Sequence, residues 1–350
     1  MGQIRVLVAD DSDLARALIC AILLTDREIA IVGEAVNGRE AVEKVKVFKP
    51  DIVTMDIEMP VLNGLDAIEQ IMADHAVPIL VVTTRGDAHT AYAAISKGAL
   101  DLVVKPDVNL EEAHEFIQRI KLLSKIKVIT HINGRRSARE KNVVPMPAPT
   151  GELSDRIVAI ASSTGGPEAL SVILSALPGS FPCPIVIAQH NSDGFIPGMV
   201  EWLRRISGVN VKVAEEGETL LPGTAYVSPS EKNMEITPAR KVALIERQLK
   251  DIYHPSCDRL LQSVALAYNA KSIGVILTGM GNDGARGMQQ IRNAGGATLA
   301  QDEKTSIVFG MPKVAIDSGC VDKIVPLDEM SNQILSLIAD SREEKNRAIC

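Results

Sequence analysis

Short apolar, β-branched runs alternate with helical patterns along most of the chain. In the first part of the chain these runs cover residues 4–8, 29–32, 52–55, 79–82 and 102–104. Segments between them, such as 13–24 and 40–48, carry apolar residues at helical spacing. Such alternation predicts a parallel sheet covered by helices on both faces. Five units of this kind within residues 1–121 predict a flavodoxin-like α/β domain with a five-stranded parallel sheet.

The alternation stops after residue 121 and resumes at 154. The intervening segment, 122–153, is rich in lysine and arginine and ends in Pro145, Pro147 and Pro149, so we interpret it as a linker. From 154 to 342 the sequence predicts a second, doubly wound α/β domain with a mainly parallel sheet. Its apolar runs include 157–161, 185–188, 225–227, 273–277 and 297–300. The last residues, 343–350, are charged and are expected to form a tail.

The overall composition narrows the functional class. The 350 residues suffice for two domains, and the net charge of -7 argues against a nucleic-acid binder. The apolar runs are shorter than the roughly 20 residues that span a membrane, and a strand-like run begins within the first five residues, which leaves no room for a signal peptide. The five cysteines form no CxxC pair, which favours reduced thiols and a cytoplasmic protein.

Polar side chains follow four of the predicted strands in the first domain. Asp10 and Asp11 come after the first run, Asp56 closes the third, Thr83 the fourth and Lys105 the fifth. Ligands of parallel α/β sheets gather outside the carboxyl ends of the strands. Three carboxylates there suit Mg²⁺, while a lysine and a hydroxyl suit a phosphoryl group. Ordinary strand-ending polar residues are the plainer alternative, but five at matching ends favour a phosphorylation site.

These residues carry a resemblance to the response-regulator receiver domain over residues 1–121. Its motifs are Ala9-Asp10-Asp11-Ser12, Met55-Asp56-Ile57-Glu58-Met59-Pro60, Asn63-Gly64, Thr83 and Lys105-Pro106. The resemblance implies that Asp56 accepts phosphate from a histidine kinase. It also implies that Asp10, Asp11 and Asp56 bind Mg²⁺, and that Thr83 and Lys105 contact the phosphoryl group.

Two positions depart from the receiver pattern. Asn63 stands where an aspartate is usual, and Leu102 stands where many receivers carry a Tyr or Phe that moves on activation. We therefore expect phosphorylation to be retained, and we expect the switch to work without an aromatic residue at position 102.

Two classes of output domain compete for residues 154–342. A DNA-binding domain would be mainly helical and basic, with a recognition helix, whereas this segment alternates strands and helices. An enzyme is therefore the stronger hypothesis. Ala161-Ser162-Ser163-Thr164-Gly165 differs by one residue from the G-x-S-x-G nucleophile elbow. The spacing favours Ser163 as the nucleophile, with Ser162 still open; a plain β–α turn or an anion cradle is the alternative.

A serine nucleophile needs a base and a group that orients the base. Of the six histidines, His190 alone directly follows a buried-looking run, at 184–189. Asp283 is the only carboxylate in the glycine-rich segment 278–284, which follows the run at 273–277. The alternative for Asp283 is a cap of a helix that begins near Ala285.

With these residues, the whole chain resembles the chemotaxis protein-glutamate methylesterases of the CheB family. The matching motifs are Ser162-Ser163-Thr164-Gly165-Gly166-Pro167, Gln189-His190, 278–284, Pro255-Ser256-Cys257-Asp258, Ala300-Gln301-Asp302-Glu303 and Val308-Phe309-Gly310-Met311-Pro312. The resemblance implies Ser163 as nucleophile, His190 as general base and Asp283 as its orienting acid. Thr164 and the backbone N–H of Met280 would support the oxyanion, and no cofactor is expected in this domain.

The resemblance implies hydrolysis of glutamate methyl esters, and deamidation of glutamines, on the cytoplasmic helices of membrane-bound chemoreceptors. The sequence departs from the family pattern at Ala161, Asn191-Ser192 and Asn233; none of these departures removes a catalytic group, and we expect them to bear on substrate preference and rate. Two alternatives remain: a receiver-gated serine hydrolase that acts outside chemotaxis, and a regulatory binding module with an inactive site.

Overall fold

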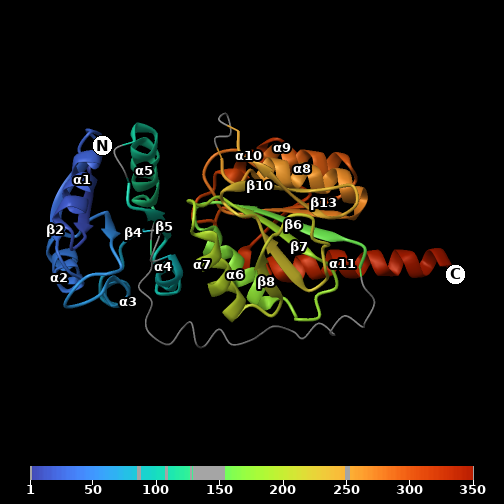
Figure 1. The fold of residues 1–350 in the computed structure, drawn as a ribbon, viewed down its shortest axis with the longest axis horizontal. Coiled ribbons are helices and arrows are strands. Elements are labelled where there is room, and N and C mark those ends of the chain that lie inside the picture. The colour runs from blue at the N-terminus through green and yellow to red at the C-terminus, as the bar shows by residue number, and fades with distance from the viewer. Residues whose placement is uncertain are drawn as a thin grey trace. The chain divides into compact units, whose positions relative to one another are not determined.

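The computed structural model describes residues 2–84, 88–106, 109–126, 128, 154–248 and 253–349. The chain divides into two compact units, Met1–Val144 and Pro145–Cys350 (Figure 1). Of the predicted linker, 122–153, the structure describes only 122–126 and 128, so its limits stay a prediction. No helix in the described part of the chain has both the length and the apolar character needed to cross a membrane.

The first unit is a five-stranded sheet in the order β2-β1-β3-β4-β5, and each neighbouring pair is parallel. This confirms the predicted flavodoxin-like domain. The strands are β1 (Ile4–Ala9), β2 (Ile29–Ala35), β3 (Ile52–Met55), β4 (Ile79–Thr83) and β5 (Asp101–Val104). The helices are α1 (Asp13–Leu23), α2 (Gly38–Phe48), α3 (Gly64–Asp74), α4 (Ala88–Ser96) and α5 (Leu110–Leu123).

Side-chain caps begin the helices that follow the first three strands. Ser12, Asn37 and Asn63 each accept a hydrogen bond from a backbone N–H in the first turn of the next helix. Asn63, which stands where the receiver pattern has an aspartate, therefore caps α3 through its side chain. A Cβ at the next residue, Gly64, would lie 1.9 Å from the carbonyl oxygen of Asp56, so only glycine lets this turn approach the end of β3.

The second unit has a seven-stranded sheet in the order β14-β13-β12-β6-β7-β9-β8, again with parallel neighbours, and a separate antiparallel pair, β10-β11. This confirms the doubly wound, mainly parallel prediction. The strands are β6 (Ile157–Ser162), β7 (Ile185–Gln189), β8 (Asn210–Val213), β9 (Thr224–Val227), β10 (Lys232–Ile236), β11 (Val242–Glu246), β12 (Ser272–Ile276), β13 (Ala297–Gln301) and β14 (Lys323–Val325).

Helices cover both faces of this sheet. They are α6 (Gly166–Ala176), α7 (Ile196–Ile206), α8 (Cys257–Tyr268), α9 (Ala285–Asn293), α10 (Met311–Asp317) and α11 (Leu327–Ile349), with a short 3₁₀ helix at Asn269–Lys271. Figure 1 places α8, α9 and α10 on one side of the sheet and α6, α7 and α11 on the other. Helix α11 continues to Ile349, through the residues where the sequence predicted a tail.

Strand order in the second unit reverses between β12 and β6. From β6 the chain proceeds to β7 on one side, and from β12 it proceeds to β13 on the other. Such a switch point opens a crevice at the carboxyl edge of the sheet, where α/β proteins bind their ligands. The segments that follow β6, β7 and β12 therefore meet at this edge, and they carry Ser163, His190 and Asp283.

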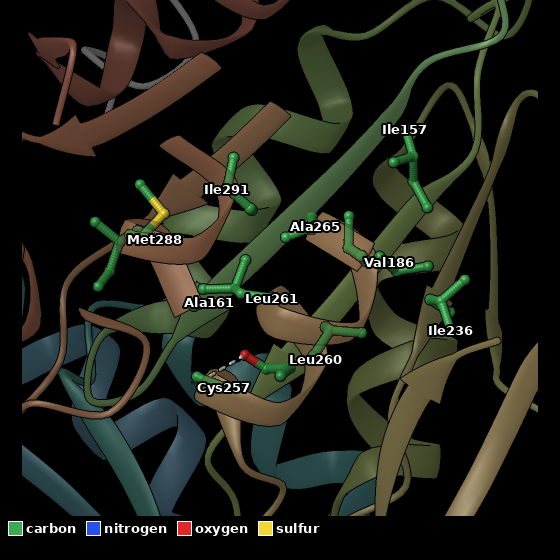
Figure 2. Close-up of a cluster of buried hydrophobic side chains, with 14 of the residues drawn as sticks. Ile157, Ala161, Val186, Ile236, Cys257, Leu260, Leu261, Ala265, Met288 and Ile291 are labelled. Carbon is green, nitrogen blue, oxygen red and sulfur yellow. Dashed lines mark hydrogen bonds between the residues drawn. The ribbon is translucent and has the colours of Figure 1, made fainter. Parts of the chain in front are cut away.

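The core beneath that edge is aliphatic, as the low aromatic content requires. Figure 2 shows Ala161 and Val186 of the sheet packed with Leu260, Leu261 and Ala265 of α8. Helices α8 and α9 can approach closely because Gly287 has no side chain. A Cβ at this position would lie 2.4 Å from Leu261 Cβ. This close packing holds the N-termini of α8 and α9 side by side, below the candidate catalytic residues.

Candidate functional site

The first unit gathers three carboxylates at the carboxyl edge of its sheet. One ligand oxygen each from Asp10, Asp11 and Asp56 lies within 4.8 Å of the others. Asp10 and Asp56 are buried, while Asp11 is exposed. Lys105 Nζ lies 2.8 Å from Asp10 Oδ2 and 2.8 Å from Asp56 Oδ2. The oxygen-only donor set fits a hard divalent cation.

Asp56 directly follows β3, in a buried environment that disfavours the ionised form of its carboxyl group. Burial raises the pKa of its carboxyl, and nearby Asp10 adds to that effect, while Lys105 and the Ile57 N–H oppose it. The Lys105 ammonium is also half-buried, yet its hydrogen bonds to the two aspartates hold its pKa above the usual value. Thr83 ends β4 and is fully buried. The predicted residues therefore lie at one sheet edge.

Leu102, where many receivers have an aromatic residue, lies in β5 and is buried. Its backbone N–H donates to the side chain of Asp101 (2.9 Å). The side chain fills the core of the unit and is not presented at the surface.

In the second unit, the two candidate serines differ in their surroundings. Ser162 is the last residue of β6, and its Oγ donates to Gln189 Oε1 at 2.7 Å. Its carbonyl accepts the N–H of His190, so Ser162 is built into the sheet edge. Ser163 follows on the turn into α6, where Gly165 adopts a φ of +76°. The geometry thus favours Ser163 over Ser162 as the residue whose hydroxyl is available.

Gln189 organises the segment that holds both Ser163 and His190. Its Nε2 donates to the carbonyl oxygens of Ser163 and His190, each at 2.8 Å. A Cβ at Gly166 would lie 1.9 Å from Gln189 Oε1, so the first residue of α6 must be glycine to leave space for this amide. Sequence reasoning assigned Gln189 no role, although its place between a buried run and His190 could have suggested one.

His190 and Asp283 are in direct contact. His190 Nε2 lies 2.8 Å from Asp283 Oδ2. Because Nε2 faces the carboxylate, the proton on the neutral ring belongs at Nε2, and the lone pair belongs at Nδ1. The structure therefore brings together two of the three predicted residues through a hydrogen bond that fixes the imidazole tautomer.

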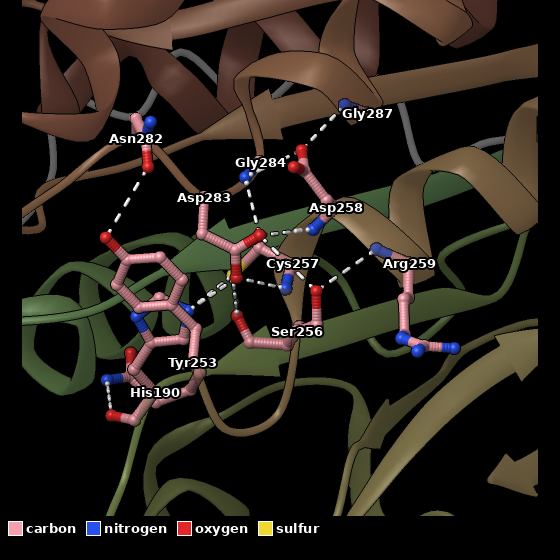
Figure 3. A network of polar contacts seen from close by, with 12 residues as sticks. His190, Tyr253, Ser256, Cys257, Asp258, Arg259, Asn282, Asp283, Gly284 and Gly287 are labelled. Carbon is pink, nitrogen blue, oxygen red and sulfur yellow. Dashed lines mark hydrogen bonds and ion pairs between the residues drawn. The ribbon is translucent and has the colours of Figure 1, made fainter. Parts of the chain in front are cut away.

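Asp283 also lies at the N-terminus of α8 (Figure 3). Its Oδ2 accepts the N–H of Cys257 (2.7 Å) and its Oδ1 accepts that of Asp258 (2.9 Å). Burial alone would raise the pKa of Asp283, but His190 and these two N–H groups outweigh it and lower the pKa below the usual value. The group stays ionised and can stabilise a cationic imidazole.

The capping is reciprocal between α8 and α9. Asp258, in the first turn of α8, accepts the N–H groups of Gly284 (3.0 Å) and Gly287 (2.8 Å) at the start of α9. Arg286 Nε donates to its second oxygen at 2.9 Å. Asp283 therefore caps mainly the neighbouring helix rather than the one that follows it, with a further bond to Gly284 N–H (3.1 Å).

The predicted oxyanion groups, Thr164 and the Met280 N–H, belong to the two segments that follow β6 and β12. Thr164 is buried, and its carbonyl accepts the Thr278 hydroxyl at 2.9 Å. The Ser163 N–H donates to the Thr278 carbonyl (3.0 Å), so it is not free to bind an oxyanion. Met280 lies two residues further on and is half-buried. A Cβ at Gly279 would lie 2.6 Å from Ser163 Cβ, which shows how closely the β12 loop approaches the serine.

Three further side chains of this site had no assigned role in the sequence analysis. Tyr253 stacks on His190, with ring centroids 5.1 Å apart. Cys257 Sγ lies 3.4 Å from His190 Nε2, but burial raises the pKa of its thiol well above the usual value, so it is not a competing nucleophile. Asn233 Oδ1 accepts the N–H of Ser256 (2.7 Å). Tyr253 and Cys257 contact His190 only through the tertiary fold, and Asn233 supports the segment between them through Ser256.

Comparisons with known proteins identify the family of each unit. Family models match residues 158–334 as CheB methylesterase and 6–118 as response regulator receiver domain. The chain is 47% identical over 347 residues to protein-glutamate methylesterase/protein-glutamine glutaminase 3 of Paramagnetospirillum magneticum, covering 97% of this chain and 98% of the relative. It is 40% identical over 348 residues to protein-glutamate methylesterase/protein-glutamine glutaminase 1 of Carboxydothermus hydrogenoformans, covering 97% and 100%.

Among solved structures, the CheB methylesterase catalytic domain of Thermotoga maritima matches with a TM-score of 0.52 and 36% identity. It covers 53% of this chain and 100% of that chain. The chain therefore belongs to the CheB methylesterase family and carries a response regulator receiver domain ahead of the esterase domain.

Proposed function

We propose that the protein is a phosphorylation-regulated protein-glutamate methylesterase that uses Ser163, His190 and Asp283 as its catalytic triad. The observation that carries this proposal is the 2.8 Å hydrogen bond between His190 Nε2 and Asp283 Oδ2, at the sheet edge where Ser163 lies. The family membership supports the reaction class. The commitment of Ser162 to Gln189 supports Ser163 as the nucleophile.

The reaction follows from the tautomer of His190. Nδ1 accepts the proton of Ser163 Oγ as that oxygen attacks the ester carbonyl, and the imidazolium formed is stabilised by Asp283. The oxyanion is held by the Met280 N–H and by Thr164. As the intermediate collapses, the bond to the methoxy oxygen breaks, that oxygen takes the proton from His190 and leaves as methanol, and the glutamyl group stays on Ser163. Water then enters by the reverse proton path and releases the free carboxylate.

The same acyl-enzyme accounts for glutaminase activity. A glutamine side chain presents an amide in place of the ester, and His190 protonates the departing ammonia instead of methanol. Both curated relatives above carry the two activities in their names. We therefore infer that this chain also deamidates glutamines.

The receiver domain supplies the regulation. A histidine kinase donates phosphate to Asp56, and Asp10, Asp11 and Asp56 would hold the Mg²⁺ on which receiver phosphorylation depends. When bound, Mg²⁺ offsets the negative charge of the phosphoryl group beside three carboxylates. Lys105, whose Nζ lies 2.8 Å from Asp56 Oδ2, contributes a positive charge beside the phosphoacceptor, and we infer that Thr83 contacts the phosphoryl group.

The substrates we infer are the methylated helices of chemoreceptors. The experiment is methanol release from methylated receptor membranes by the full-length protein with a small phosphodonor. Ser163→Ala should lower the rate of methanol release by about three orders of magnitude or more. Ser162→Ala should retain most of the wild-type rate. The opposite pattern contradicts the assignment. Activity on small methyl esters without activity on receptors indicates a hydrolase outside chemotaxis, and activity on neither indicates a binding module.

A further inference from the structure

The Tyr253 ring covers one face of the His190 imidazole. The ring centroids are 5.1 Å apart and the planes differ by 8°. Figure 3 shows the two side chains next to each other. We propose that Tyr253 is a positioning residue of the esterase reaction, which fixes the plane of His190 and stabilises its cationic form through the aromatic face. This inference rests on the proposed role of His190 as the general base.

The chain on both sides of the stack is anchored. The N–H of Asn191, next to His190, donates to the carbonyl oxygen of His254, next to Tyr253, at 3.1 Å. Ser256 N–H donates to Asn233 Oδ1 at 2.7 Å. The backbone bond between the neighbours of the two stacked residues therefore holds the two segments side by side, which keeps the rings within reach of each other.

The loop after β12 leaves room for the phenol. A Cβ at Gly281 would lie 2.6 Å from the Tyr253 hydroxyl oxygen, and Gly281 adopts a φ of +89° that favours glycine. The hydroxyl donates to Asn282 Oδ1 at a long 3.4 Å. This contact is weak, so the ring rather than the hydroxyl is the part of Tyr253 that matters for the reaction.

The stack with Tyr253 matters for the reaction because His190 becomes positively charged when it acts as the base. When Ser163 Oγ bonds to the ester carbon, its proton moves to His190 Nδ1 and the ring becomes an imidazolium. An aromatic face within about 6 Å of a cation attracts it. Asp283 stabilises this cation at the edge of the ring and Tyr253 at its face. The neutral ring gains less from the stack, so the contact acts on the transition state more than on the ground state.

The test compares Tyr253→Leu with Tyr253→Phe in the full-length protein with saturating phosphodonor. Leucine removes the π face, and phenylalanine restores it without the hydroxyl. We expect Tyr253→Leu to lower kcat by about 2- to 30-fold with KM nearly unchanged. Tyr253→Phe should recover most of the lost kcat. Tryptophan fluorescence and the midpoint of thermal unfolding establish that both variants are folded.

Three outcomes overturn the inference: Tyr253→Leu is as active as the wild type, Tyr253→Phe is as impaired as Tyr253→Leu, or Tyr253→Leu raises KM without lowering kcat. A loss confined to KM would make Tyr253 a substrate contact. His190→Ala in the same assay separates this inference from the proposed function. If His190→Ala retains activity, the triad itself is wrong; if it abolishes activity while Tyr253→Leu does not change it, only the role of Tyr253 fails.

Discussion

Replacing Asp283 by asparagine tests how one carboxylate serves both catalysis and stability. Oδ2 accepts from His190 Nε2 (2.8 Å) and Cys257 N–H (2.7 Å), and Oδ1 accepts from Asp258 N–H (2.9 Å) and Gly284 N–H (3.1 Å). The amide of asparagine has one acceptor oxygen, which can replace either Oδ1 or Oδ2 of Asp283. Its NH₂ group then occupies the place of the other oxygen and faces the donors that this oxygen had accepted. The substitution therefore leaves buried donors without acceptors.

The magnitude follows from those contacts. An unsatisfied buried backbone N–H costs about 1–3 kcal/mol, and the lost negative charge at the N-terminus of α8 costs about 1–2 kcal/mol more. We expect Asp283→Asn to lower the free energy of unfolding by about 2–5 kcal/mol. An amide NH₂ facing His190 Nε2 also forces the ring proton onto Nδ1, which then cannot accept the proton of Ser163. That tautomer should lower kcat by about 10³- to 10⁴-fold.

Asp258→Asn is the matched control. Its amide oxygen can keep both N–H groups of α9, and the NH₂ group would face only Arg286, whose side chain is 86% exposed and can be solvated by water. We expect a loss of about 1 kcal/mol in stability and a change in kcat of less than about fivefold. Asp258 makes the same kind of helix cap but no contact with His190.

The assays are methanol release at saturating phosphodonor and urea unfolding followed by fluorescence. The single tryptophan, Trp202, lies in α7 and therefore reports on the second unit. Equal kcat in the two variants, or an Asp283→Asn protein with wild-type kcat, would refute the reasoning. Loss of stability in Asp258→Asn that exceeds the loss in Asp283→Asn would refute the capping argument.

Three other predictions concern regulation, packing and pH. Asp56→Asn should abolish labelling by a small phosphodonor with Mg²⁺ and remove any rise in esterase rate on adding donor; labelling at the wild-type level excludes this site. Gly279→Ala should lower kcat at least tenfold, since its Cβ would lie 2.6 Å from Ser163 Cβ and 2.4 Å from Met311 Sδ; a wild-type rate contradicts the close approach. Because the pKa of Asp283 is lowered in the folded protein, its ionised carboxylate stabilises the fold at pH values above the ordinary carboxyl pKa. This stabilisation is lost as the pH falls through the pKa of Asp283 in the folded state. The stability gap between wild type and Asp283→Asn should therefore narrow below about pH 4, and a gap that widens there would have the wrong sign.

The sheet architecture and the positions of the site residues could be predicted from the sequence. Buried parallel strands read as continuous apolar runs, and polar side chains at their carboxyl ends mark the edge where a site forms. The β10-β11 pair was not predicted, because Lys232–Ile236 and Val242–Glu246 mix charged and apolar residues and lack a continuous apolar run. The long α11 was not predicted either, because its last turns are charged.

The partners of the site residues could not be predicted in the same way. Asp283 is near Ala285 in sequence, so a local pattern indicates a cap of α9. Its main backbone partners, Cys257 and Asp258, become neighbours only when α8 packs on α9. The Tyr253–His190 stack likewise depends on how the segment before α8 crosses the end of β7. Side-chain contacts of this kind depend on tertiary packing and have no local periodicity.

The most direct test of the central claim is to trap the acyl-enzyme. The phosphorylated full-length protein would be quenched in acid during turnover of a glutamyl methyl ester peptide and digested with trypsin. Cleavage at Arg156 and Arg204 releases a peptide, 157–204, that contains both candidate serines. Fragmentation by mass spectrometry should locate the glutamyl adduct on Ser163, and the adduct should be absent from His190→Ala. An adduct on Ser162, or a full adduct yield in His190→Ala, would contradict the account.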